Sequence, residues 1–174
     1  MGLFGKLLSG ILGVPYYASI EDCKKAAISG DAAAQCKLGL AYADGESGLP
    51  QDYAEAAKWY RLAAQKGDAF AERALGSIFD RGGAGVTQDF KEAAKWYALA
   101  AEHGEAEAQL RLGHMNYNGQ GVAKDYKQAM KWYRLAANQG NAEAQLYLGR
   151  MYHDGKGGVV QDYREACRPA RRAA

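Results

Sequence analysis

One pattern recurs four times along this chain of 174 residues and constrains its fold more than any other feature. An aspartate followed by an aromatic residue recurs at intervals of 37, 36 and 37 residues, at positions 52, 89, 125 and 162. Lys-Trp-Tyr triplets and Leu-Gly pairs keep the same register. A period of this length is typical of repeat proteins, in which each unit buries its apolar face against its neighbours. The chain is therefore predicted to be a repeat array.

Each unit has the pattern of two helices. In the second unit a first helix is predicted over 69–81, from the helical spacing of Ala71, Leu75, Ile78 and Phe79. The glycine-rich run 82–86 then breaks the pattern. The next helix is expected to begin at the N-cap Asp89, with Glu92 at capping-box spacing. Gly104 would close that helix in the left-handed conformation.

The repeated aromatic and glycine residues are interpreted as core positions. The three tryptophans, each in a Lys-Trp-Tyr triplet, are predicted to lie between successive units, where such a side chain buries about 150–250 Å². They are Trp59, Trp96 and Trp132. The glycine of each Leu-Gly pair is predicted to let a partner helix approach closely, at a helix-propensity cost of about 1 kcal/mol. A cofactor-binding role is disfavoured, because stacked repeats need such residues for packing.

Composition narrows the functional classes. Hydrophobic residues at 48% and charged residues at 24% match ordinary globular proteins and argue against disordered and transmembrane classes. A net charge of +2 is too small to indicate a nucleic-acid partner. Three cysteines cannot all pair, which favours free thiols in the cytoplasm. A helix hairpin could nevertheless bring Cys23 and Cys36 face to face. Periplasmic and membrane-peripheral locations are the alternatives.

Motifs that carry chemistry are missing from the sequence. It contains no phosphate-binding loop, no nucleophile elbow and no zinc-ligand spacing. His114 and His153 could approach each other across neighbouring first helices, but catalytic zinc sites use about three protein ligands. The sequence therefore predicts no catalytic residue, no cofactor and no metal ion.

The chain is divided into an amphipathic segment, 1–14, and a solenoid, 15–174, of about four repeats with degenerate ends. Apolar residues at helical spacing give the first segment two interpretations: a lid over the first unit, or peripheral membrane or partner contact through residues 2–12. A signal peptide is disfavoured because the apolar stretch is short and Lys6 is its only charge. Pro169 is expected to stop the last helix.

Two consecutive stretches make up one full cycle. The first reads Ala-Glu-Ala-Gln-x-x-Leu-Gly-x-Met-Tyr-x-x-Gly-x-Gly-Val, and the second Asp-Tyr-x-x-Ala-x-x-Trp-Tyr-x-x-Ala-Ala-x-x-Gly. This cycle resembles the Sel-1-like repeat, a relative of the tetratricopeptide repeat, over about residues 15–162. The resemblance implies an all-α, right-handed superhelical solenoid of antiparallel helix pairs. It also implies a non-enzymatic adaptor or scaffold that holds a protein or peptide on its concave surface.

Two other functions stay open beside the scaffold. The first is a periplasmic peptidoglycan- or β-lactam-related enzyme or binding protein of the cysteine-rich Sel-1-like branch. Members of that branch carry a cysteine pair in most repeats, and this chain has no such pairs. The second is a membrane-associated regulator that uses the apolar stripe of residues 2–12.

The resemblance also places twelve candidate partner-binding residues on the concave side. They are Lys37, Phe70, Arg73, Ser77, Arg81, Leu110, Arg111, His114, Tyr117, Tyr147, Arg150 and His153. Arginine, tyrosine and histidine of this kind favour a protein partner with some acidic character, because arginines such as Arg73, Arg111 and Arg150 bind carboxylates bidentately. In the third unit the aromatic residue is displaced by one position. A rotation of about 100° would turn Tyr117 toward the concave side and leave Asn116 near the core.

Overall fold

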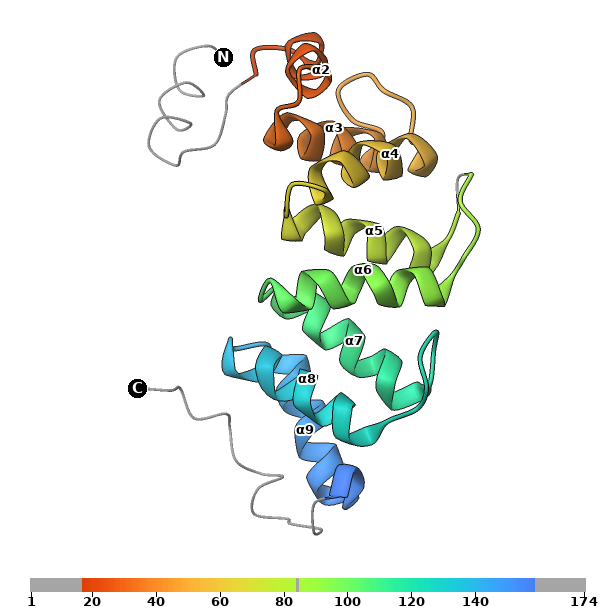
Figure 1. The fold of residues 1–174 in the computed structure, drawn as a ribbon, viewed down its shortest axis with the longest axis vertical. Helices are drawn as coiled ribbons and strands as arrows, with labels where there is room; N and C mark the ends of the chain where they lie inside the picture. The colour runs from red at the N-terminus through yellow and green to blue at the C-terminus, as the bar shows by residue number, and fades with distance from the viewer. Residues whose placement is uncertain (1–16, 84, 159–174) are drawn as a thin grey trace.

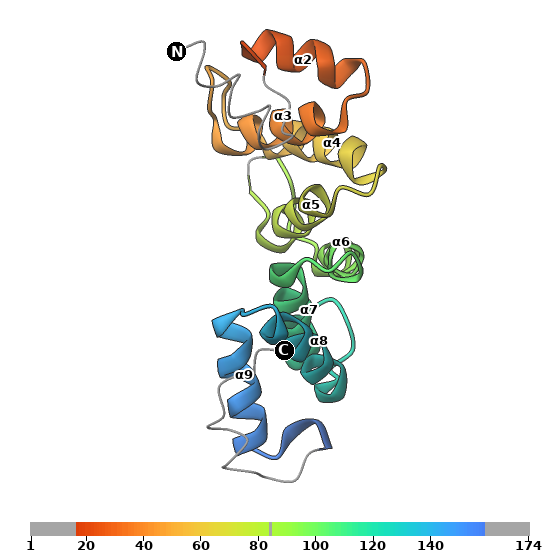
Figure 2. The ribbon, with the colours of Figure 1, turned by 90° about the vertical axis from the view of Figure 1, so that its left-hand side faces the viewer.

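The computed structural model describes residues 17–83 and 85–158, which form a stack of antiparallel helices along one long axis (Figure 1). The helices are α2 (Ile20–Ile28), α3 (Ala32–Asp44), α4 (Tyr53–Ala64), α5 (Ala69–Arg81), α6 (Phe90–Glu102), α7 (Ala106–Asn118), α8 (Tyr126–Asn138) and α9 (Ala142–His153). A 3₁₀ turn, η1 (Lys156–Gly158), follows α9. Within these residues the only β-type pairing is an isolated bridge between Gly83 and Val86. The predicted all-α, right-handed superhelical solenoid is confirmed, and Figure 2 shows its elongated shape.

The start of each second helix is fixed by its aspartate cap, as predicted. Asp89 accepts hydrogen bonds from the backbone N–H groups of Lys91 and Glu92, at 2.9 and 3.0 Å. Asp52 and Asp125 do the same in their own units. The capping box also predicted a reciprocal bond from the backbone N–H of Asp89 to the side chain of Glu92. This prediction is wrong, because that N–H donates to the carbonyl of Phe79 on the preceding helix instead. Glu92 is thereby free to bind Lys95 and the indole N–H of Trp96.

The two helices of a unit meet where a tyrosine ring lies on a glycine backbone. A Cβ atom added to Gly76 would lie 2.6 Å from Cδ1 of Tyr97, closer than real Cβ contacts come. The same arrangement occurs in two other units, in the pairs Gly39–Tyr60 and Gly113–Tyr133. Glycine is therefore required at this position, which confirms the predicted close approach.

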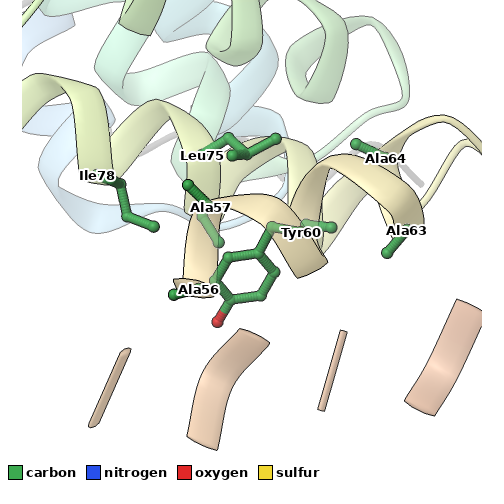
Figure 3. Packing of buried hydrophobic residues seen from close by; sticks show 9 residues of the cluster. Ala56, Ala57, Tyr60, Ala63, Ala64, Leu75 and Ile78 are labelled. Atoms are coloured by element: carbon green, nitrogen blue, oxygen red, sulfur yellow. The ribbon is translucent and has the colours of Figure 1, made fainter. Parts of the chain in front are cut away.

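The tryptophans and tyrosines of the repeated triplets have different neighbours. Each tryptophan is half-buried and packs on the core of the preceding pair of helices, as Trp96 does on the cluster of α4 and α5. The fully buried aromatic residue is the tyrosine that follows, which the sequence analysis did not identify. Adjacent residues of a helix point about 100° apart. The tryptophan therefore faces the neighbouring unit, whereas the tyrosine after it faces the glycine of its own unit. In Figure 3 the ring of Tyr60 points away from Leu75 of α5.

The displaced aromatic residue of the third unit behaves partly as predicted. Asn116 is buried, and its Nδ2 donates to the carbonyl of Leu112 at 2.8 Å. Tyr117 is half-buried because its ring packs on Tyr126, with 5.1 Å between centroids, and its hydroxyl accepts from Lys156 Nζ. Tyr117 is therefore held by the start of α8 and by η1.

The two cysteines within the described residues are free thiols. Cys23 Sγ lies 3.5 Å from the carbonyl of Ala34, whereas Cys36 Sγ lies 3.9 Å from Asp68 on the far side of its helix. The face-to-face arrangement considered for these cysteines is therefore not formed.

The predicted amphipathic segment 1–14 and Pro169 lie outside the described residues. Among the helices that the structure describes, none combines the length and apolar character required to cross a bilayer.

The ring-on-glycine contact predicts the effect of Gly76→Ala. The added methyl overlaps Tyr97, so the free energy of unfolding should fall by about 1–3 kcal/mol in urea denaturation. In a Tyr97→Leu background the overlap is removed, and Gly76→Ala should become neutral or stabilising because alanine favours helix. Equal destabilisation in both backgrounds would show that the ring and the glycine are not coupled.

The burial difference within each triplet predicts unequal costs of truncation. Tyr97→Ala should lower the free energy of unfolding by about 3–5 kcal/mol, because it empties a fully buried site. Trp96→Ala should also lower the melting temperature, but by less, because the indole is partly exposed. Matched thermal and urea denaturation of the two variants checks this order. An unchanged melting temperature for Trp96→Ala would contradict the inter-unit role of Trp96.

Candidate functional site

The first helices of the units, α3, α5, α7 and α9, carry the predicted partner-binding residues, and α5 and α7 contact each other directly. We call this row of helices the inner face. One predicted residue is excluded from its surface: Leu110 is 1% exposed and belongs to the core that α7 shares with α8 and α9. The other eleven predicted residues are half-buried or exposed.

Arg73 connects two units across the inner face. Its Nε lies 3.0 Å from Oε1 of Glu105, the residue that caps α7, and its guanidinium lies 4.7 Å from the ring centre of Phe70. Sequence analysis missed Glu105, because the pairing spans two units. Arg73 thus already has a carboxylate partner within the chain.

A small charged hollow of about 50 Å³ lies between α5 and α7. It is lined by Arg73, Ser77, Asp80, Arg81, Tyr97, Glu107 and Arg111. Arg111 Nε lies 2.9 Å from Glu107 Oε1, a pairing that the i,i+4 spacing in the sequence could have indicated. Burial, assisted by Asp80, raises the pKa of Tyr97 to about 12, so its hydroxyl stays protonated. The hollow is far smaller than an ordinary ligand pocket of about 300 Å³ or more.

An aromatic cluster lies at the C-terminal end of the inner face. The His114 ring lies 4.4 Å from that of Tyr147 and 5.5 Å from that of Tyr133, measured between centroids. Tyr133 and Tyr147 stack at 5.3 Å. Burial lowers the pKa of His114, partly opposed by Glu143, whose Oε1 lies 3.8 Å from Nε2. Burial thus favours the neutral form of His114.

Arg150 differs from Arg73 and Arg111, which are both paired with carboxylates of the chain. Its guanidinium lies 5.5 Å from the ring centre of Tyr147, and no carboxylate of the described residues is paired with it. Its side chain is exposed. An exposed arginine over an aromatic ring is positioned to bind a carboxylate or a peptide carbonyl of another molecule.

The remaining predicted residues are spread along the inner face. Lys37 lies over the ring of Tyr17, at 5.3 Å from its centre. His153 Nδ1 lies 3.0 Å from Asp154, so the two histidines His114 and His153 have different neighbours. Across residues 17–83 and 85–158, no group of three or more potential metal ligands is present.

The surroundings of His114 predict its titration. Because burial favours the neutral ring, its imidazole should titrate below the ordinary histidine pKa of about 6.5. The unfolded chain then binds the proton more readily, so this residue removes stability as the pH falls below about 6.5. The chemical shift of the His114 ring proton, assigned with His114→Gln, checks this. A titration midpoint above that of free histidine would contradict it.

Comparison with solved structures and family models agrees with this geometry. The chain is similar to c5321, a protective antigen of uropathogenic Escherichia coli, with 39% identity over 84% of this chain and a TM-score of 0.80. It is also similar to a Sel1 repeat protein from Oxalobacter formigenes, with 38% identity over 94% of this chain and a TM-score of 0.76. The chain spans 31% of the first protein and 65% of the second.

A more distant similarity is to cysteine rich protein B of Helicobacter pylori. It has 25% identity over 72% of this chain and 93% of that protein, with a TM-score of 0.56. Comparison with curated proteins gave no match. The family model "Sel1 repeat" matches residues 32–68, 69–105, 106–141 and 142–174. The first three matches cover the helix pairs α3–α4, α5–α6 and α7–α8, the fourth begins at α9, and the chain therefore belongs to the Sel1 repeat family.

Proposed function

We propose that this protein is a non-catalytic scaffold that holds a segment of another protein on the C-terminal part of its inner face. Sel1 repeat proteins are generally protein-interaction scaffolds built from helical repeats. The observation that carries the proposal is Arg150, exposed over Tyr147 without a carboxylate partner among the described residues, beside His114. Arginine and tyrosine are the residue types enriched where partner proteins bind most strongly.

The contacts also indicate where on the inner face an acidic residue of the partner would bind. Arg150 can bind a partner carboxylate without breaking an existing pair. Arg73 and Arg111 would have to give up Glu105 and Glu107 first, which exchanges one ion pair for another. We therefore expect one acidic residue of the partner at Arg150 and largely uncharged contacts on Tyr147 and His114.

The hollow and the thiols favour the scaffold over the periplasmic enzyme alternative. The hollow between α5 and α7 is small, and its lining holds no nucleophile beside a histidine base. The free thiols Cys23 and Cys36 favour a reducing compartment such as the cytoplasm over the periplasm. Membrane contact through residues 2–12 predicts that deletion of this segment abolishes co-sedimentation with lipid vesicles, whereas the scaffold proposal does not depend on it.

The proposal is tested by affinity capture from native lysate with wild type and two charge-matched variants. Arg150→Glu should weaken binding of the partner by about tenfold or more, because a favourable charge-assisted contact becomes repulsive. Lys91→Glu makes the same charge change on α6, away from the inner face, and should bind like wild type. Quantitative mass spectrometry, followed by titration of the captured protein, gives the ratio. Identical capture by all three forms would contradict a site at Arg150.

A further inference from the structure

The first helices carry a repeated polar side chain that ties each unit to the one before it. At this position three units have glutamine, and each amide donates to the carbonyl of the alanine eight residues earlier, on the preceding helix. The bonds are Gln35 to Ala27 at 3.0 Å, Gln109 to Ala101 at 3.1 Å and Gln145 to Ala137 at 3.4 Å. They join α3 to α2, α7 to α6 and α9 to α8.

The second unit has Glu72 at this position, and the corresponding tie is missing. Glu72 is 3% exposed, and an ionised carboxylate has no proton to donate to a carbonyl. Within the described residues it makes no bond to α4; its Oε2 lies 2.8 Å from Nδ1 of His103, at the end of α6. The carboxylate is therefore satisfied within its own unit rather than across the junction of α4 and α5.

A second tie is missing from the same junction. In two units, a side chain just after the end of the second helix donates a hydrogen bond to a backbone carbonyl of the preceding unit. The acceptor is the glycine that follows the second helix of that preceding unit. Lys66 donates to the carbonyl of Gly30, and Gln139 donates to that of Gly104 at 2.9 Å. His103 holds this place in the second unit but turns to Glu72 instead. Between α4 and α5 there remain the apolar cluster, the Tyr60 and Phe70 rings at 6.4 Å between centroids, and Arg61 over the ring of Phe79.

We propose that the α4–α5 junction is a hinge of the solenoid whose stiffness depends on pH through the Glu72–His103 pair. Protonated His103 gives buried Glu72 a charge-assisted partner. When the imidazole loses its proton, the ionised carboxylate keeps only a weaker bond, and burying it costs more. Histidine changes charge between pH 5 and 8, so the junction opens more readily at pH 8 than at pH 5.

The other ionisable groups around this end of α5 are already engaged. Asp68 caps α5 and lies beside Cys36 of α3, whose pKa is raised to about 12 by burial, so this thiol does not ionise in that range. Arg73 is paired with Glu105, and Lys66 of the α4 end with Gly30. His103 is therefore the ionisable side chain that contacts Glu72 among the described residues.

Hydrogen exchange of the full chain, read by mass spectrometry, tests the hinge. The amides of residues 66–68 bond back to Ala63 and Ala64, so their exchange reports opening of the α4–α5 turn. Those of 139–141 serve as reference, because they form the same turn between α8 and α9. After correction for intrinsic exchange, protection at 66–68 should fall by about fivefold to tenfold from pH 5 to pH 8, with no such change at 139–141.

Two variants assign the effect to the pair. Glu72→Gln supplies the amide that the other units have, so protection at 66–68 should rise and become independent of pH. His103→Gln leaves the buried carboxylate without a titrating partner, so protection should be low and equal at both pH values. Wild-type protection at 66–68 that matches 139–141 at both pH values would overturn the hinge. A wild-type pH profile in Glu72→Gln would overturn the role of the pair. Neither result depends on whether the inner face binds a partner.

Discussion

A tyrosine ring packed against a glycine backbone sets the distance between the two helices of a unit, and the rest of the solenoid is arranged around that contact. The ring fills the space that a side chain at the glycine would otherwise take, so α5 and α6 pack closely at Gly76 and Tyr97. This close approach brings the end of α5 near the start of α6, where the backbone N–H of Asp89 reaches the carbonyl of Phe79. Between units, α4 and α5 share a cluster of alanines with Leu75 and Ile78, on which Trp96 of the next helix packs.

Much of this fold follows from the sequence because a repeat shows which positions are equivalent. The helix 69–81 and the cap at Asp89 were predicted with their observed bounds, since apolar spacing and capping chemistry are local. The relative burial of Trp96 and Tyr97 was not predicted. Both are large, adjacent and equally repeated, and only the three-dimensional path of the neighbouring helices decides which one faces the glycine.

At the candidate site, too, the sequence predicted which helix carries a residue but not the contacts between residues far apart in the chain. Family resemblance placed Arg150 and His114 on the first helices, where the structure has them. It also placed Leu110 on the surface, although this side chain is buried against α8 and α9. The pairing of Arg73 with Glu105 joins residues of different units, and no local pattern distinguishes such a pair from two solvated charges. The sequence therefore identified which helices carry the candidate residues, but not which of their charged side chains are already paired within the chain.

The half-buried tryptophans give the molecule a built-in set of optical reporters. Each indole rests on the core of the preceding pair of helices, so Trp59, Trp96 and Trp132 sample three successive junctions. Solenoids lose structure by units rather than in one step when their interfaces differ in strength. In chains that keep one tryptophan at a time, fluorescence would resolve the order in which the junctions separate. The repetition that makes the units alike thus also makes their differences measurable.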